Sequence, residues 1–157
     1  MTLVRVNKDN LDEYEEFIKK HPKGLFQHSS KWAKVKSAWK FEAIMLKNDS
    51  GEIKGSAAVL IRSIPIIKNS LMYCCRGFVC DENDFDTFDK LFNGLIELGK
   101  EYKAYCIKID PEIVIQNEAY KKHLIESGFI ELNPGCMDFE NVQPRFVYCF
   151  DYNDMNE

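Results

Sequence analysis

Apolar residues in the first third of the chain recur with the spacing of one short strand and two amphipathic helices. A run at residues 3–6 predicts the strand. Across residues 11–20 the apolar positions lie three and four apart, so they share one face of a helix that Asn10 can cap and that residues 22–24 end. Residues 29–30, both serine, open a second, shorter helix, whose shared apolar face carries Trp32, Val35 and Trp39.

The middle of the chain predicts an antiparallel hairpin with a third strand beside it. Residues 41–46 and 53–64 are rich in β-branched and other apolar side chains, and residues 48–51 between them, Asn-Asp-Ser-Gly, are a strong turn sequence. Pro65 closes the second strand. We expect residues 70–79 to form the third strand of the same sheet.

A long helix and a compact strand follow. The strand covers residues 104–109 and stops at Asp110, because the residue before Pro111 is pushed to extended geometry that ends the element. The helix begins at Asp84 and keeps the helical period of apolar positions for several turns. Its buried face is predicted to hold Phe85, Phe88, Leu91, Phe92, Leu95 and Leu98.

The C-terminal part predicts one more helix and two strands. The helix runs from about residue 117 to residue 126 and ends at Gly128, and residues 135–139 and 145–150 are the predicted strands. The resulting order, β-α-α-β-β-β-α-β-α-β-β, is that of a GNAT-like fold of the α/β (α+β) class. We therefore expect one domain over residues 1–157, with a central mixed, mostly antiparallel sheet flanked by helices.

Composition narrows the class of protein. A chain of 157 residues, 45% hydrophobic and 29% charged, fits one globular domain with a single core. The net charge of −4, with Lys and Arg scattered, offers no footprint for non-specific binding to a phosphate backbone. No apolar run is long enough to cross a bilayer, and the polar first ten residues do not form a signal peptide, so we expect the protein in the cytosol.

Cysteine and histidine spacing argues against a metal site. The six cysteines include no C-x-x-C pair, which excludes a zinc ribbon or thioredoxin motif and predicts buried thiols in a reducing compartment. His21, His28 and His123 show no ligand or triad spacing, so we interpret each as a surface or capping histidine.

Short stretches in a specific order and spacing connect the chain to a known family. They are Phe26–Ser29, Trp32–Lys36, Ile61–Pro65, Tyr73–Gly77, Ile107–Pro111 and Val142–Arg145. Together, from about Asn10 to the end, they resemble the FemABX family of peptidoglycan interpeptide-bridge aminoacyltransferases. Full-length members have two GNAT-like halves and transfer amino acids from aminoacyl-tRNA to the peptidoglycan stem peptide.

The sequence departs from the family pattern in two places. Phe78 follows Gly77 where the family usually has proline, and both residues before Arg76 are cysteines. After residues 143–145 the family continues into a second half, whereas this chain ends at Glu157. The resemblance therefore implies the first half only, with the second half absent.

The resemblance also suggests site residues. The family match of Lys36 contacts the phosphates of the nucleotide-linked precursor; the alternative is an ordinary solvated lysine. The match of Asp110 has been considered the base for the acceptor amine, and its place at the end of a buried strand suits that role. The alternative for Asp110 is a turn-forming residue. Two roles are open for Tyr105, which either lines the same cleft or fills the core. Two are also open for Arg76, which either binds a phosphate or carboxylate or anchors a loop.

The expected function is transfer of an amino acid from aminoacyl-tRNA, as donor and without a cofactor, to UDP-MurNAc-pentapeptide or lipid II. Such a protein would work in the cytoplasm, peripheral to the inner face of the membrane. One alternative is an N-acetyltransferase using acetyl-CoA, but the acidic residues 81–86 would repel pyrophosphate at the helix start, and no glycine-rich pyrophosphate motif occurs. Another is a non-catalytic precursor-binding module, working as a homodimer or with a separate second-half partner.

Overall fold

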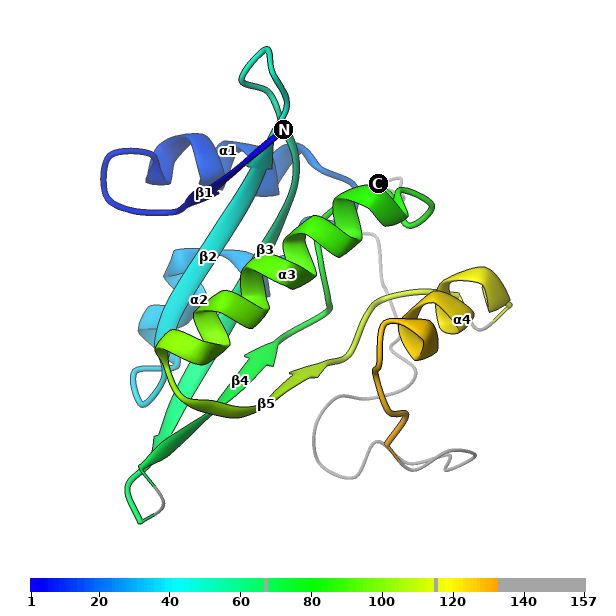
Figure 1. The fold of residues 1–157 in the computed structure, drawn as a ribbon. Coiled ribbons are helices and arrows are strands. Elements are labelled where there is room, and N and C mark those ends of the chain that lie inside the picture. The colour runs from blue at the N-terminus through cyan, green and yellow to red at the C-terminus, as the bar shows by residue number, and fades with distance from the viewer. Residues whose placement is uncertain (67, 115, 133–157) are drawn as a thin grey trace, which may run out of the picture.

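The computed structural model describes residues 1–66, 68–114 and 116–132 (Figure 1). Most predicted elements up to residue 132 are present, and the strands predicted at 135–139 and 145–150 lie outside the described residues. The order is β1 (Thr2–Arg5), α1 (Leu11–Lys20), the 3-10 helix η1 (Phe26–His28), α2 (Ser30–Val35), β2 (Lys40–Lys47), β3 (Ile53–Ile64), β4 (Asn69–Cys74), α3 (Phe85–Glu101), β5 (Ala104–Ile109) and α4 (Glu118–Glu126).

The strands form one sheet in the order β1-β2-β3-β4-β5. Every neighbouring pair is antiparallel except β4 and β5, which are parallel, so the predicted mixed, mostly antiparallel sheet is confirmed. Residues 48–51 form the predicted turn, in which the Asn48 side chain accepts the backbone N–H of Ser50 at 3.1 Å and of Glu52 at 2.9 Å. Parallel pairing of β4 with β5 requires a crossover, and α3 supplies it.

Helices cover both faces of the sheet (Figure 1). Side chains alternate along each strand, so neighbours in β2 enter different cores: Ile44 and Leu46 face α3, whereas Met45 faces α1. The predicted apolar face of α3 is confirmed, with Phe88, Leu91, Leu95 and Leu98 buried. On the opposite face Tyr14 is fully buried, and its hydroxyl donates to the His28 carbonyl at 2.6 Å. This bond ties η1 to α1.

The third strand is shorter than predicted. It ends at Cys74 because Arg76 (φ 60°) and Gly77 (φ 76°) adopt left-handed backbone geometry, which no strand can contain. The chain returns to the sheet at Val79, which forms an isolated antiparallel bridge with Ser56. The predicted strand at residues 70–79 is therefore two segments separated by a turn.

Two helix predictions need correction. The second helix ends at Val35, with Lys36 as its C-cap, so Trp39 lies in the following turn and not on the helix. There its backbone N–H donates to the Lys36 carbonyl at 2.8 Å. The first helix begins where predicted, but the Asn10 side chain does not cap it; Asn10 Oδ1 instead accepts the backbone N–H of Asn7 at 2.8 Å.

The thiol and histidine predictions hold in part. Cys74, Cys75 and Cys80 are buried as expected, whereas Cys106 is exposed on β5. His28 is a capping residue, because its Nδ1 accepts the Leu25 N–H at 3.0 Å, but it is buried and not on the surface. Cys136 and Cys149 lie outside the described residues. Within the described ranges, no helix combines the length and apolar character needed to cross a membrane.

Candidate functional site

A cavity of about 300 Å³ lies between the α2 region and the sheet face formed by β3 and β4. Half of its lining residues are aromatic, because the turn after α2 adds a second tryptophan to the one on the helix. Such a wall, interrupted by a few polar groups, is typical of small-molecule sites. The lining residues are Phe26, Gln27, Trp32, Lys36, Trp39, Leu60, Tyr73 and Cys75.

Lys36 is the cation among these lining residues. It ends α2, and its Nζ lies 5.1 Å from the centroid of the Trp32 ring, within the range of a cation–π contact. Phe26 meets Trp32 edge to face at 5.0 Å and so holds the indole in place. The ammonium is thus presented at an aromatic surface, where it can pair with an anionic group on a ligand whose rings or apolar parts contact the walls.

Tyr73 and Asp110 form a polar pair at the other side of the cavity. Tyr73 lines the cavity from β4, and Asp110 directly follows β5, the parallel neighbour of β4. Asp110 Oδ1 accepts the Arg76 backbone N–H at 2.8 Å. Asp110 Oδ2 and Tyr73 Oη are buried within reach of each other, and neither makes a well-formed hydrogen bond among the described residues. Unpartnered buried oxygens are costly, so this pair is suited to receive a donor from a ligand.

The electrostatics of this pair favour proton acceptance by Asp110. Burial raises the pKa of the Asp110 carboxyl, and the Arg76 N–H and the nearby Tyr73 offset only part of that effect. Burial also raises the pKa of Tyr73, with further contributions from the Cys75 thiol and the Asp110 carboxylate. Tyr73 therefore stays a neutral hydroxyl, and Asp110 is a stronger base than an ordinary carboxylate.

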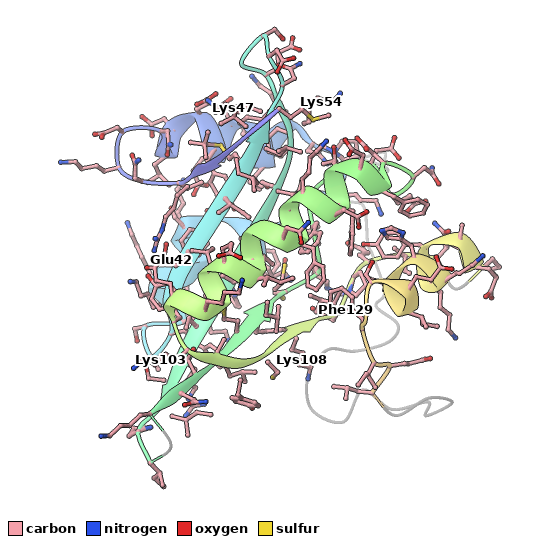
Figure 2. All side chains as sticks on the ribbon, in the orientation of Figure 1. Glu42, Lys47, Lys54, Lys103, Lys108 and Phe129 are labelled. Carbon is pink, nitrogen blue, oxygen red and sulfur yellow. The ribbon has the colours of Figure 1, made fainter. Side chains whose placement is uncertain are left out.

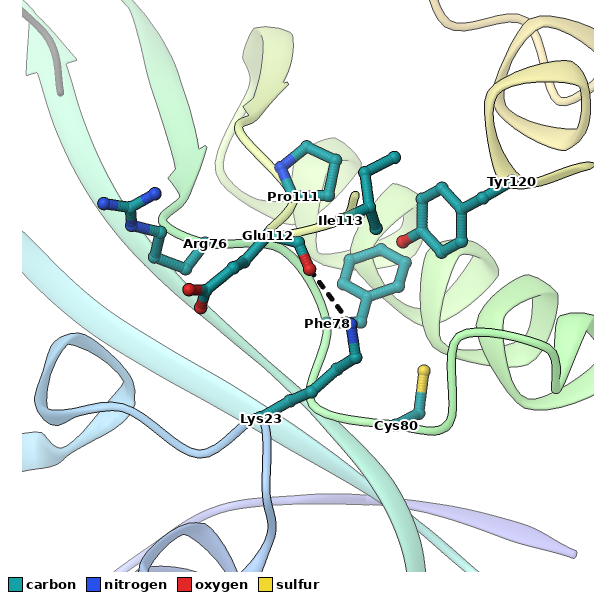
Figure 3. A pocket seen from close by; sticks show the side chains of 8 residues that line it. All are labelled: Lys23, Arg76, Phe78, Cys80, Pro111, Glu112, Ile113 and Tyr120. Atoms are coloured by element: carbon teal, nitrogen blue, oxygen red, sulfur yellow. Dashed lines mark hydrogen bonds between the residues drawn. The ribbon is translucent and has the colours of Figure 1, made fainter. Parts of the chain in front are cut away.

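Arg76 is placed differently from the prediction. Its backbone positions Asp110, but its side chain lines a separate crevice beside Lys23, Phe78 and Glu112 (Figure 3). The free space there is about 10 Å³, hardly enough for one water molecule. Lys23 Nζ crosses the crevice and donates to the Glu112 carbonyl at 2.9 Å (Figure 3). The crevice is therefore a packed junction between loops.

The predicted site residues thus separate into groups. Lys36 lines the cavity, and Asp110 lies beside its wall, in reach of Tyr73. The Arg76 side chain lines the crevice, and Tyr105 is 56% exposed on β5 and lines neither space. Sequence reasoning assigned no role to Tyr73, although it opens the Tyr73–Gly77 stretch and precedes the end of a strand, where ligands gather.

The start of α3 bears out the acidic character expected for this segment. Asp84 is the N-cap, and its carboxylate accepts the Thr87 N–H at 3.0 Å and the Thr87 hydroxyl at 2.7 Å. Asp81 accepts the Asn83 N–H at 2.8 Å. Carboxylates of the chain itself therefore occupy the place where an anionic ligand would meet the helix N-terminus.

Comparison with known proteins places these features in context. The sequence model of the FemAB family matches residues 10–157. A lipid II:glycine glycyltransferase of Staphylococcus epidermidis is 36% identical over 120 residues, which are 74% of this chain and 29% of that protein. A crystal structure of FemX superposes with a TM-score of 0.72 at 30% identity, covering 82% of this chain and 32% of that chain.

The fold itself is shared more widely. A crystal structure of a probable acetyltransferase, 14% identical, superposes with a TM-score of 0.63 over 96% of this chain and 100% of that chain. At this identity the likeness concerns the fold alone, and it confirms the predicted GNAT-like architecture. The chain spans 29% of the S. epidermidis relative and 32% of FemX.

Proposed function

The chain belongs to the FemAB family, and we propose that it forms the first half of an aminoacyltransferase that builds peptidoglycan interpeptide bridges. The transferred amino acid would come from aminoacyl-tRNA, and the acceptor would be the stem-peptide amine of a cell-wall precursor. The name of the S. epidermidis relative, lipid II:glycine glycyltransferase, supports a lipid-linked acceptor. With such an acceptor the protein would work in the cytoplasm, at the inner face of the membrane.

The observation that carries this proposal is a cavity lined by both Lys36 and Tyr73, with the Asp110 carboxylate behind Tyr73. Lys36 supplies a positive charge suited to the precursor's phosphates. Tyr73 and Asp110 supply buried oxygen acceptors suited to the precursor's amine. A molecule with phosphate at one end and a primary amine at the other would satisfy both sides.

In the proposed reaction, the amine nitrogen attacks the ester carbonyl carbon of the aminoacyl-tRNA. Asp110 Oδ2 accepts a proton from the amine, and the Tyr73 oxygen accepts a hydrogen bond that orients it. A new amide bond forms as the bond between the carbonyl carbon and the tRNA ribose oxygen breaks. That oxygen leaves as a hydroxyl after taking up a proton, so the proton held by Asp110 is returned. The donor would be a substrate, and the reaction needs no cofactor.

An acetyl-CoA-dependent N-acetyltransferase is a weaker candidate. The fold is compatible with it, but the residues at the start of α3 are not, because Asp84 already caps the helix. The turn after β4 is also closed, since Gly77 packs so tightly that an added Cβ would lie 3.0 Å from the Pro111 Cα. Tight binding of acetyl-CoA in calorimetry would reverse this ranking.

The other alternative is a non-catalytic module that binds the precursor. A direct experiment distinguishes it from the proposed enzyme. The purified chain is titrated with UDP-MurNAc-pentapeptide, with and without charged tRNA, while binding and amino-acid transfer are measured independently. Transfer supports the complete proposal. Binding without transfer assigns the chain to precursor recognition, completed by a second copy or a second-half partner. Absence of binding both to UDP-MurNAc-pentapeptide and to lipid II removes both cell-wall functions.

A further inference from the structure

Charge is divided between the two ends of the sheet, although the whole chain carries only −4. One end holds the β2–β3 turn and the start of α3, with acidic residues at 49, 52, 81, 82, 84 and 86. The opposite end holds the turn after α2, the β3–β4 hairpin and the turn between α3 and β5. The register places them together, because Lys40 lies opposite Ile61, Asn69 opposite Ile64 and Ala104 beside Ser70.

This opposite end, which we call the hairpin end, is basic. Neither the turn after α2 (residues 36–39) nor the β3–β4 hairpin (residues 60–74) contains an Asp or Glu. Arg62, Lys68 and Lys103 are exposed there. The Glu101 carboxylate at the same end pairs with Arg5 at 2.9 Å, and Glu42 pairs with both Arg5 at 2.8 Å and Lys40 at 3.1 Å, so two cations compensate these two carboxylates. Figure 2 shows Lys103 at this end, whereas Lys47 and Lys54 mark the other end.

The β3–β4 hairpin carries an apolar tip. It projects from the sheet beyond the helices (Figure 1), and Ile66 at its turn is 94% exposed. The preceding Pro65 is also exposed, and Ile64 is half-buried. A large aliphatic side chain so fully in water gains nothing from the fold, and its burial elsewhere would be favourable.

We propose that the hairpin end docks on an anionic lipid bilayer, with Ile66 inserted at the headgroup boundary and Arg62, Lys68 and Lys103 against lipid phosphates. An apolar tip ringed by basic side chains is the composition of segments that bind membrane surfaces, since burial and charge attraction add. Each alone is weak.

A bilayer fits this surface better than an RNA backbone does. RNA phosphates would account for the basic residues but would leave Ile66 without a favourable contact, because base and backbone recognition uses polar and aromatic side chains. Trp39 lies beside one of these basic residues, with its ring centroid 5.7 Å from Arg62 Cζ. Tryptophan beside a cation is favoured at the membrane interface.

The hairpin end also leads to the cavity. Trp39 and Lys36 lie on the cavity wall and in the turn that belongs to this end. A protein docked through the hairpin would hold the cavity close to the lipid headgroups. The advantage of that placement rests on the proposed function, in which the acceptor is lipid-linked, but the docking itself requires no catalysis.

Co-sedimentation of the purified chain with vesicles tests the proposal. The vesicles are phosphatidylcholine alone or phosphatidylcholine with phosphatidylglycerol, and the variants are Ile66→Ser, Lys68→Glu and the matched charge reversal Lys54→Glu at the acidic end. We expect binding to the anionic vesicles only, weakened about tenfold by Ile66→Ser and at least about fivefold by Lys68→Glu. Lys54→Glu should bind like the unmodified chain, and added salt should weaken binding.

Three outcomes would overturn docking: no binding to anionic vesicles, equal loss from Lys54→Glu and Lys68→Glu, or binding that Ile66→Ser does not change. Binding to total tRNA in place of vesicles, insensitive to Ile66→Ser, would assign the basic end to RNA. Because soluble UDP-MurNAc-pentapeptide has no lipid tail, its binding to Ile66→Ser separates the two proposals. Retained precursor binding with lost vesicle binding marks the hairpin as a membrane contact, independent of the cavity.

Discussion

The Arg76 backbone N–H donates to Asp110 Oδ1 at 2.8 Å and so joins the turn after β4 to the end of β5. Arg76 itself has left-handed backbone geometry (φ 60°) at this turn. One Asp110 oxygen is thereby fixed, while the other remains unpartnered among the described residues, beside the hydroxyl of Tyr73. A structural tie thus orients the carboxylate that we propose as the base.

Asp110→Asn should abolish amino-acid transfer and should weaken precursor binding far less than it slows transfer. The amide keeps the shape and can still accept the Arg76 N–H, but it cannot take a proton, and the loss of a general base typically costs about 10²- to 10⁴-fold in rate. Transfer of a labelled amino acid and calorimetric binding are measured on the same preparation. Tyr73→Phe is the companion variant and should lower the rate less. Unchanged transfer by Asp110→Asn would remove Asp110 from the chemistry.

The same substitution should change how stability depends on pH. Burial raises the pKa of Asp110 in the folded state, so the folded protein retains its proton longer than the unfolded chain does. Stability from this group therefore falls as pH rises from the ordinary carboxyl pKa through the raised one. The Asp110→Asn variant lacks that fall. In urea unfolding, the free energy of unfolding of the variant minus that of the unmodified chain should therefore increase between pH 3 and pH 7. A relative stability independent of pH would contradict the raised pKa.

His28 should make the protein sensitive to mild acid. Burial lowers its pKa from 6.5 to about 4, so the unfolded chain takes up a proton at a pH where the folded protein does not. The contribution of this histidine to the free energy of unfolding is fully present above pH 6.5. It declines by up to roughly 3 kcal/mol as the pH falls toward 4. Urea unfolding at pH 7 and pH 4.5 measures the decline. It should be much smaller in His28→Gln and only slightly smaller in the control His21→Gln, because burial also lowers the pKa of His21 but that side chain is only half-buried.

Gly77→Ala should destabilise the protein more than Gly51→Ala. Both glycines have positive φ, 76° and 87°, so an alanine is strained at either. An added Cβ at Gly77 would lie 3.0 Å from the Pro111 Cα, whereas nothing lies within 4 Å of one at Gly51. We expect about 1 kcal/mol for Gly51→Ala and roughly 2–4 kcal/mol for Gly77→Ala. Equal losses in thermal unfolding would show that the contact with Pro111 is unimportant.

Hydrophobic periodicity predicted most helices and strands. Many of them bury one face in one of the two cores, so their apolar residues recur at the spacing of a helix or a strand. The pattern of α3 is the best example: Phe88, Leu91 and Leu95 recur at helical spacing, and each is buried. The end of β4 escaped prediction because it depends on a left-handed arginine, which no local rule anticipates. Strand pattern alone would have continued through Arg76 to Val79.

The site was less accessible to sequence reasoning than the fold. Tyr105 was predicted to line the cleft or fill the core because it lies in the same strand as Asp110, but the pairing of β4 with β5 shifts register between Ser70 and Leu71, and Tyr105 is exposed. Trp39 was assigned to a helix face because its spacing fits, whereas the helix ends four residues earlier, at Val35. Lys36 and Asp110 were found through family resemblance, and only the three-dimensional packing brings Tyr73 between the cavity and Asp110.

The most direct test of the account is calorimetric titration of the chain with UDP-MurNAc-pentapeptide, comparing Lys36→Ala with Lys34→Ala. Both lysines are exposed and belong to the α2 region, but only Lys36 lines the cavity. We predict that the unmodified chain and Lys34→Ala bind alike and that Lys36→Ala binds roughly tenfold more weakly, as expected for the loss of a charged hydrogen bond. No binding by the unmodified chain, or equal affinity of both variants, would contradict the assignment of this cavity to the precursor.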